Sequence, residues 1–165
     1  MNKLLLIISL VGFYSFSQAM ENWPRFRGNN GDGYAPCTIP SSWKKNSYRW
    51  SLPLSDEGHG SPSVWGNRVF VNSSTDQGKT RKILCVNAKD GTVEWTRSYP
   101  SQNHKTHRFN SFASSTPALD KENVYSIWGH TTELKVSAHN HQGKLLWETD
   151  LGGVKGSHGF AVFTI

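Results

Sequence analysis

Short apolar runs separated by turn-forming residues make up most of the chain after its first twenty positions. The runs are rich in Val, Ile, Phe, Tyr and Trp, and they are bounded by Gly, Asn, Asp, Ser or Pro. No spacing of apolar residues typical of an amphipathic helix runs through this part of the sequence. Because short apolar runs alternating with turns are typical of regularly spaced strands, the pattern predicts an all-β protein.

The apolar runs fall into two similar sets of four. We expect strands at 61–65, 68–73, 82–87 and 92–99 in the first set, and at 115–119, 123–128, 133–138 and 144–151 in the second. A turn separates the last two runs of each set, at Asp90-Gly91 and at Gln142-Gly143. An Asp-Gly pair between apolar runs is a strong hairpin signal, since both central residues of a type I′ turn need positive φ. Each set therefore predicts one four-stranded antiparallel sheet, with a polar loop at 74–80 inside the first.

The two sets are copies of one repeat. Trp50, Trp95 and Trp147 are each followed four positions later by a bulky apolar residue, and Trp95 and Trp147 follow a hairpin glycine by four positions. Pro62 and Pro117 open the two sets at a spacing of 55 residues. Self-similarity at about fifty residues indicates a repeat architecture, and a repeated four-stranded antiparallel unit is typical of the blades of a β-propeller.

The repeat spacing predicts a partial β-propeller over 49–165. It would contain about two four-stranded antiparallel blades, at 49–99 and 100–151, and the start of a third. Because propellers typically contain about four to eight blades, we expect a truncated piece of a longer protein. Exposed blade faces would then promote self-association. We also expect Trp95 and Trp147 to occupy equivalent positions and to pack against the next repeat.

The first 19 residues have the pattern of a secretory signal peptide. Lys3 precedes an apolar stretch at 4–16, and Ser17-Gln18-Ala19 supplies the small residues of a cleavage site. The alternative is a membrane anchor, but the stretch is shorter than the roughly 20 residues that a spanning helix needs. We therefore expect a periplasmic or secreted protein with no membrane span after cleavage, and a lead-in segment at 20–48. No cysteine follows the apolar stretch as a lipid-modified protein would require.

Charge and cysteine content add further constraints. The formal net charge is +6 at pH 7, but the basic residues are scattered in pairs such as 44–45 and 81–82. Because nucleic-acid binding needs a clustered basic surface, we expect no nucleic-acid partner. Cys37 and Cys85 fit an oxidising compartment and could form a disulfide. The apolar run around Cys85 favours a buried free thiol instead.

Four histidines form two close pairs. His139 and His141 would share one face of a strand, but their position before Gly143 makes them hairpin-turn residues. His104 and His107 lie in a long polar loop with no third ligand nearby. Because a zinc site needs three or four ligands, we expect no metal site at either pair.

Two further histidines, His59 and His158, are the candidate ligand contacts of the chain. Each lies beside glycine at the entry to a repeat, where a closed propeller would face its central channel. The segment 29–33 is rich in Asn, Asp and Gly but lacks the first and last acidic ligands of a calcium loop. It is interpreted as a glycine-rich turn.

These motifs resemble the repeat of the PQQ-binding-like β-propeller family. The family repeat reads Ser-Pro, a Gly or Asp turn, Val-Tyr/Phe-Val, and Leu-x-Ala-x-x-x-x-Gly-x-x-x-Trp. Here the matching residues include Ser61-Pro62, Val69-Phe70-Val71, and Gly91 with Trp95. The family includes the propeller of the outer-membrane assembly factor and the quinone-dependent alcohol dehydrogenases. The resemblance covers nearly all of 22–160 and implies the fold more strongly than any activity.

The resemblance also implies what an enzyme of this family would carry. Such enzymes stack the quinone on adjacent cysteines, hold calcium with a Glu, Asn and Asp set, and use an Asp as base. Cys37 and Cys85 are far apart, and no acidic residue matches the set. We therefore interpret the chain as an exported non-catalytic binding or scaffolding β-propeller of the bacterial cell envelope. It would have no catalytic residue and no cofactor, and its protein or small-molecule partner is unidentified. The alternative is the N-terminal part of a PQQ-dependent dehydrogenase, with PQQ and calcium.

Overall fold

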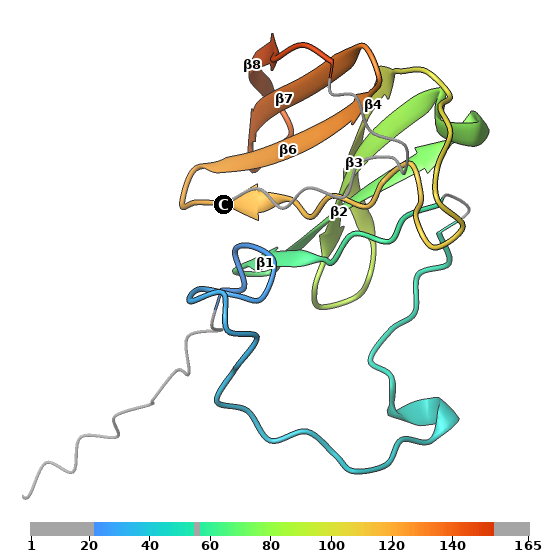
Figure 1. The fold of residues 1–165 in the computed structure, drawn as a ribbon. Helices are drawn as coiled ribbons and strands as arrows, with labels where there is room; N and C mark the ends of the chain where they lie inside the picture. Colours follow the sequence, from blue (N-terminus) through green and yellow to red (C-terminus); the bar gives the residue numbers. More distant parts are fainter. Residues whose placement is uncertain (1–21, 55–56, 154–165) are drawn as a thin grey trace, which may run out of the picture.

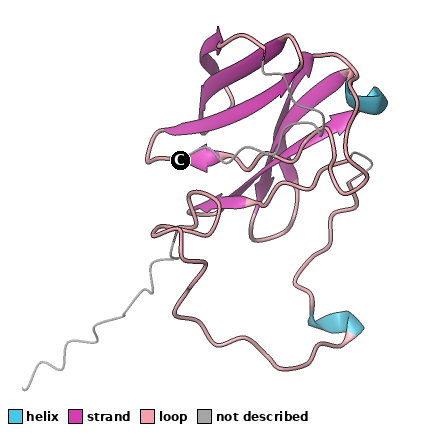
Figure 2. Cartoon of the chain, in the orientation of Figure 1, coloured by secondary structure: helices cyan, strands magenta, loops and turns pink. Residues whose placement is uncertain are grey.

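The computed structural model describes residues 22–54 and 57–153, which fold into two four-stranded antiparallel sheets (Figures 1 and 2). The first sheet has the order β1 (Ser63–Trp65), β2 (Arg68–Thr75), β3 (Thr80–Asn87) and β4 (Val93–Pro100). The second has the order β5 (Ala118–Leu119), β6 (Asn123–His130), β7 (Glu133–Asn140) and β8 (Leu145–Asp150). Two short 3-10 turns, η1 (Lys45–Ser47) and η2 (Asp76–Gly78), complete the elements. The expected all-β fold with two blade-like sheets is confirmed. The expected signal peptide and third repeat lie outside the described residues.

The two sheets repeat the same register. Cys85 pairs with Trp95 across β3 and β4, and the register shifts immediately afterwards. Ala138 pairs with Trp147 across β7 and β8, followed by the same shift. Each shift lies just before the hairpin turn, where an extra residue increases the local twist of the strand. The two tryptophans therefore occupy equivalent positions of the two sheets.

The inner hairpins are longer than the sequence pattern indicates. Ser74 pairs with Arg81, and Thr75 pairs with Thr80, so the expected polar loop shortens to a turn around η2. The loop was expected because the side chains of these residues are polar. Their backbone groups nevertheless form the hydrogen bonds of the sheet, which do not depend on side-chain polarity. In the second sheet, β7 continues through His139 to Asn140. The placement of His139 in a hairpin turn was therefore wrong.

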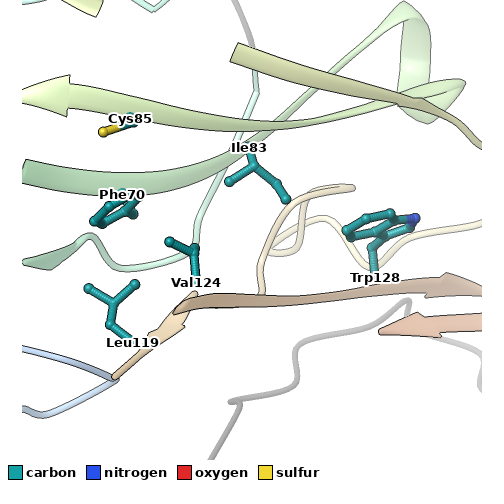
Figure 3. Close-up of a cluster of buried hydrophobic side chains, with 6 residues drawn as sticks. All are labelled: Phe70, Ile83, Cys85, Leu119, Val124 and Trp128. Carbon is teal, nitrogen blue, oxygen red and sulfur yellow. The ribbon is translucent and has the colours of Figure 1, made fainter. Parts of the chain in front are cut away.

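A hydrophobic core fills the space between the sheets (Figure 3). Its members alternate along the strands, since successive side chains of a strand point to opposite faces. The buried cluster comprises Phe70, Ile83, Cys85, Leu119, Val124 and Trp128. Phe70 and Val124 have no exposed surface. This alternation determines which face of each sheet packs against the other sheet.

The lead-in segment is joined to the innermost strands. Trp23 forms two backbone hydrogen bonds with Val64 of β1, of 2.9 and 2.8 Å. Leu119 of β5 donates its N–H to the Pro24 carbonyl at 2.7 Å. One short segment therefore connects both sheets at their inner edge, as Figure 1 shows for the blue chain beside β1.

Candidate functional site

Two tryptophans dock onto the hairpin turns of the sheet that follows them. Trp50 donates its indole N–H to the Ala88 carbonyl at 2.9 Å, and its ring lies over Gly91. Trp95 donates to the His141 carbonyl at 3.0 Å. Each tryptophan thus packs its large ring against a hairpin and satisfies its only side-chain hydrogen-bond donor.

The hairpin glycines are required by this docking. Gly91 and Gly143 have φ of +77° and +80°, and a Cβ at either would lie 2.7 Å from the ring of Trp50 or Trp95. A side chain would therefore meet both backbone strain and a ring that occupies its place. The glycine and the tryptophan of successive repeats form one unit of the interface between sheets.

Trp147 is placed like Trp95 but has no hairpin to dock on within the described residues. Trp147 is 46% exposed, whereas Trp95 is half-buried. It contacts the ring of Tyr125 in its own sheet at a centroid distance of 6.2 Å. The repeat that would follow lies beyond residue 153, outside the described chain. Trp95 is therefore less exposed than Trp147 because a hairpin of the following sheet covers it.

The two repeat prolines lie at the start of the innermost strands. Pro117 is fully buried, and its carbonyl accepts the hydroxyl of Ser63 at 2.5 Å. Pro62 is exposed. The contact joins β1 of the first sheet to the start of β5 in the second.

The segment around His59 packs through its backbone. The His59 N–H lies 3.1 Å from the Ala113 carbonyl and 3.1 Å from the Ser111 hydroxyl. A Cβ on the neighbouring Gly60 would lie 2.2 Å from the Ser115 carbonyl, so glycine permits this approach. His59 itself is exposed, and His158 lies outside the described residues. The structure therefore does not bring the two candidate ligand contacts together.

His139 and His141 serve packing between the sheets. His139 is fully buried and hydrogen-bonds the Tyr99 hydroxyl. Burial, with a smaller contribution from the charge of Arg97, lowers the pKa of His139 from 6.5 to about 4. His141 packs on Phe70 at a ring distance of 5.4 Å. Throughout 22–54 and 57–153, no three His, Cys, Asp or Glu residues are grouped as a metal ion would require.

Both cysteines are free thiols. Cys85 is buried, as expected from its apolar run, whereas Cys37 is exposed. Burial raises the pKa of Cys85 to about 12, and the nearby Glu94 carboxylate adds to the effect. Because the thiolate is the reactive form, this thiol is inert at neutral pH.

A buried polar seam between the sheets is the main feature that the sequence did not predict. Asn72 donates to the carbonyl and hydroxyl of Ser115 at 3.2 and 3.1 Å, and it accepts the Ser126 hydroxyl at 3.0 Å. Asn72 is 5% exposed and Ser126 has no exposed surface. The amide therefore links β2, the loop before β5, and β6. The only available signal was a polar residue in a strand where the other repeat has Ile127.

An apolar cavity lies on the opposite face of the first sheet. Its volume is about 100 Å³, and the segment after Trp50 forms one wall with Leu52 and Leu54. Val71 and Leu84 of the sheet form part of the other wall. The segment at 50–54 thus covers β2 and β3 from the side away from the second sheet.

A family model described as the outer membrane protein assembly factor BamB matches residues 41–162. BamB from Moraxella catarrhalis is 21% identical, with 66% of this chain and 30% of that chain covered and a TM-score of 0.46. A europium-containing methanol dehydrogenase is 11% identical, with 62% and 30% covered and a TM-score of 0.34. No curated protein gives a significant match.

This chain thus spans only 30% of the length of either solved structure. In the part of the chain that the structure describes, no helix has the length and apolar character of a membrane span. The family model extends over both sheets and the segment that carries Trp50. The chain therefore belongs to the PQQ-like β-propeller family of the outer membrane protein assembly factor BamB.

Proposed function

We propose that the protein is an exported, non-catalytic binding or scaffolding β-propeller of the bacterial cell envelope. The observation that carries the proposal is that the signature tryptophans of the repeat are engaged in packing one sheet on the next. Trp50 and Trp95 dock on the following hairpins and donate their only N–H to backbone carbonyls. The repeat motif thus builds a stack of sheets, and function is left to the surfaces that the stack presents.

The sequence at 1–19 supports export, and the family supports an envelope location. The test is to express the tagged chain in a Gram-negative host and release the periplasm by osmotic shock. The released protein should begin at Met20, as read by N-terminal sequencing. A matched variant without residues 2–19 should remain in the cytoplasm. Retention of the full chain in the cytoplasm would contradict the proposal of export.

The scaffolding role is tested on the outer edge of the first sheet. Photo-cross-linking residues placed singly at the exposed Thr96 and Ser98 of β4 should capture a partner in the periplasm of living cells. The same residue at Ile83, which is 1% exposed, should capture none and serves as the control. Equal yields from exposed and buried positions would show that the adducts are nonspecific.

The competing function is the N-terminal part of a PQQ-dependent dehydrogenase. Quinone and calcium are titrated into the purified protein, with calorimetry and dye reduction followed in parallel. We expect neither saturable binding nor turnover, because quinone chemistry needs a cofactor held in a fixed site with its carbonyl polarised by the metal. Saturable binding with turnover would establish the dehydrogenase instead. Loss of both in His59→Ala would then place the site at the repeat entry.

A further inference from the structure

A buried cation lies at the start of β3, between the two sheets. Arg81 is 2% exposed, and its Nε and Nη1 atoms have no hydrogen-bond partner. Its Nη2 lies 3.4 Å from Nε2 of His104. No acidic side chain forms an ion pair with Arg81 among the described residues. A buried guanidinium without a counter-charge is costly, because the ion loses its hydration and gains no compensating attraction.

The neighbours of Arg81 contribute no negative charge. His104 Nδ1 lies 3.1 Å from the Lys105 carbonyl, so this nitrogen carries the proton and Nε2 accepts from Arg81. The Phe112 ring lies 5.2 Å from the guanidinium carbon. Gly78 makes room for that ring, since a Cβ there would lie 2.4 Å from it. A neutral imidazole and an aromatic face stabilise the cation only in part.

A second unpartnered polar group and a small cavity lie near the guanidinium, although the group's residue, Ser74, is not among those that line the cavity. Ser74 pairs with Arg81 across β2 and β3, is 1% exposed, and has a buried hydroxyl without a partner. A cavity of about 10 Å³ is lined by Arg81, Asn72, Phe112 and Ser115. A space of this size holds one water-sized sphere. It is too small for a tetrahedral oxyanion.

The second sheet shows that the repeat itself needs no cation here. Ser74 pairs with Arg81 one position from the β2–β3 turn, and Gly129 pairs with Leu134 one position from the β6–β7 turn. The position of Arg81 is thus taken by a leucine in the other copy. Packing of the fold is compatible with an apolar residue at this place, so the buried charge calls for another explanation.

We propose that the cavity beside Arg81 binds one small monovalent anion of chloride size. The guanidinium, whose Nε and Nη1 atoms are unpartnered, would donate Nε–H and Nη1–H to the anion. A single-atom anion matches the positive charge of the guanidinium and needs less room than a tetrahedral oxyanion. Because the cavity also has a wall from Trp128 of β6, a bound anion would tie the first sheet to the second. The site is independent of the proposed scaffolding role.

The first test is thermal unfolding of the purified protein at constant ionic strength, with sodium chloride exchanged for sodium gluconate. A ligand that binds only the folded state raises Tm in a saturable manner, so Tm should rise with chloride and then level off. Arg81→Leu, which copies Leu134, should lose this dependence. Arg108→Leu changes an exposed arginine in the loop between β4 and β5, the loop that also carries His104. This variant should keep the dependence of Tm on chloride. Equal Tm values in both salts for the wild type would overturn the proposal.

Two further measurements keep the inference testable if Arg81→Leu fails to fold. Arg81→Lys keeps the charge but offers a single donor centre, and it should weaken chloride binding about tenfold. Crystals grown in bromide should show an anomalous peak within hydrogen-bond distance of the guanidinium. Unchanged chloride affinity in Arg81→Lys, or an ordered water without anomalous signal, would overturn the proposal.

Discussion

The first and second sheets share one plan of strands but differ in what their outer strands meet. Trp95 of β4 docks on the hairpin at Gly143, whereas Trp147 of β8 is 46% exposed. All six residues of β8 are exposed, while β4 alternates between half-buried and exposed. Burial of the signature tryptophan is therefore a property of two successive sheets and not of one repeat.

Corresponding positions of the two sheets differ in chemistry as well. Asn72 and Arg81 of the first sheet correspond by register to Ile127 and Leu134 of the second. The buried His139 of the second sheet stands where the first has a valine, Val86. Repetition thus fixes the backbone plan, while the polar groups of one particular interface are free to vary.

The largest effect should come from a side chain at the hairpin on which Trp95 docks. Gly143→Ala adds a Cβ at φ +80°, only 2.7 Å from the indole. We expect a loss of about 2–4 kcal/mol in the free energy of unfolding, from left-handed strain and overpacking together. Urea unfolding measures it. Gly66→Ala is the control, since Gly66 has φ +55° with nothing within 4 Å. Equal losses at both glycines would disprove the docking argument.

The second prediction concerns the histidine found only in the second sheet. The pKa of His139 is about 4 when folded and 6.5 when unfolded, because burial penalises the imidazolium. The unfolded chain therefore binds more protons between these values, and stability falls as pH drops from 6.5 to 4. The loss should be at most about 3 kcal/mol. His139→Val, which copies Val86, should flatten this part of the pH profile. A variant with the wild-type slope would contradict the assignment.

A smaller effect should separate the two equivalent tryptophans. Trp95→Phe removes the indole N–H that donates to His141 and should cost about 1–2 kcal/mol in unfolding free energy. Trp147→Phe alters a half-exposed ring and should stay within about 0.5 kcal/mol of wild type. Thermal or urea unfolding of both variants gives the comparison. Similar losses for the two would mean that Trp147 is docked in solution.

The smallest effect is expected at an ion pair present in the first sheet alone. Arg68 and Glu94 lie 2.7 Å apart with side chains 35% and 26% exposed. The register places Leu146 of β8 where β4 has Glu94. Glu94→Leu should therefore cost less than about 1 kcal/mol, as partly exposed pairs do, and the difference should shrink in high salt. A loss as large as that of Gly143→Ala would mean that this pair, and not the docking, controls the interface.

Much of the fold could be predicted from the sequence because it rests on local chemistry. Hairpin glycines with positive φ and alternating apolar residues act within a few residues, and the repeated tryptophan marks the period of the repeat along the chain. The two sheets and the family are confirmed on that basis. The signal peptide, the domain bounds and the ligand role of His59 stay predictions. The long inner hairpins could not be predicted, because polar residues such as Ser74 give no sign of ladder pairing.

The sequence by itself determined the number of strands, their antiparallel order and the identity of the repeat, since period and turn chemistry are written along the chain. Only the tertiary structure decided which polar side chains meet. Asn72 contacts Ser115 and Ser126, residues 43 and 54 positions away. Tyr99 meets His139 in the same way. Such contacts depend on how two sheets stack, and a stacking geometry arises from the sum of many packing contacts that no single motif encodes.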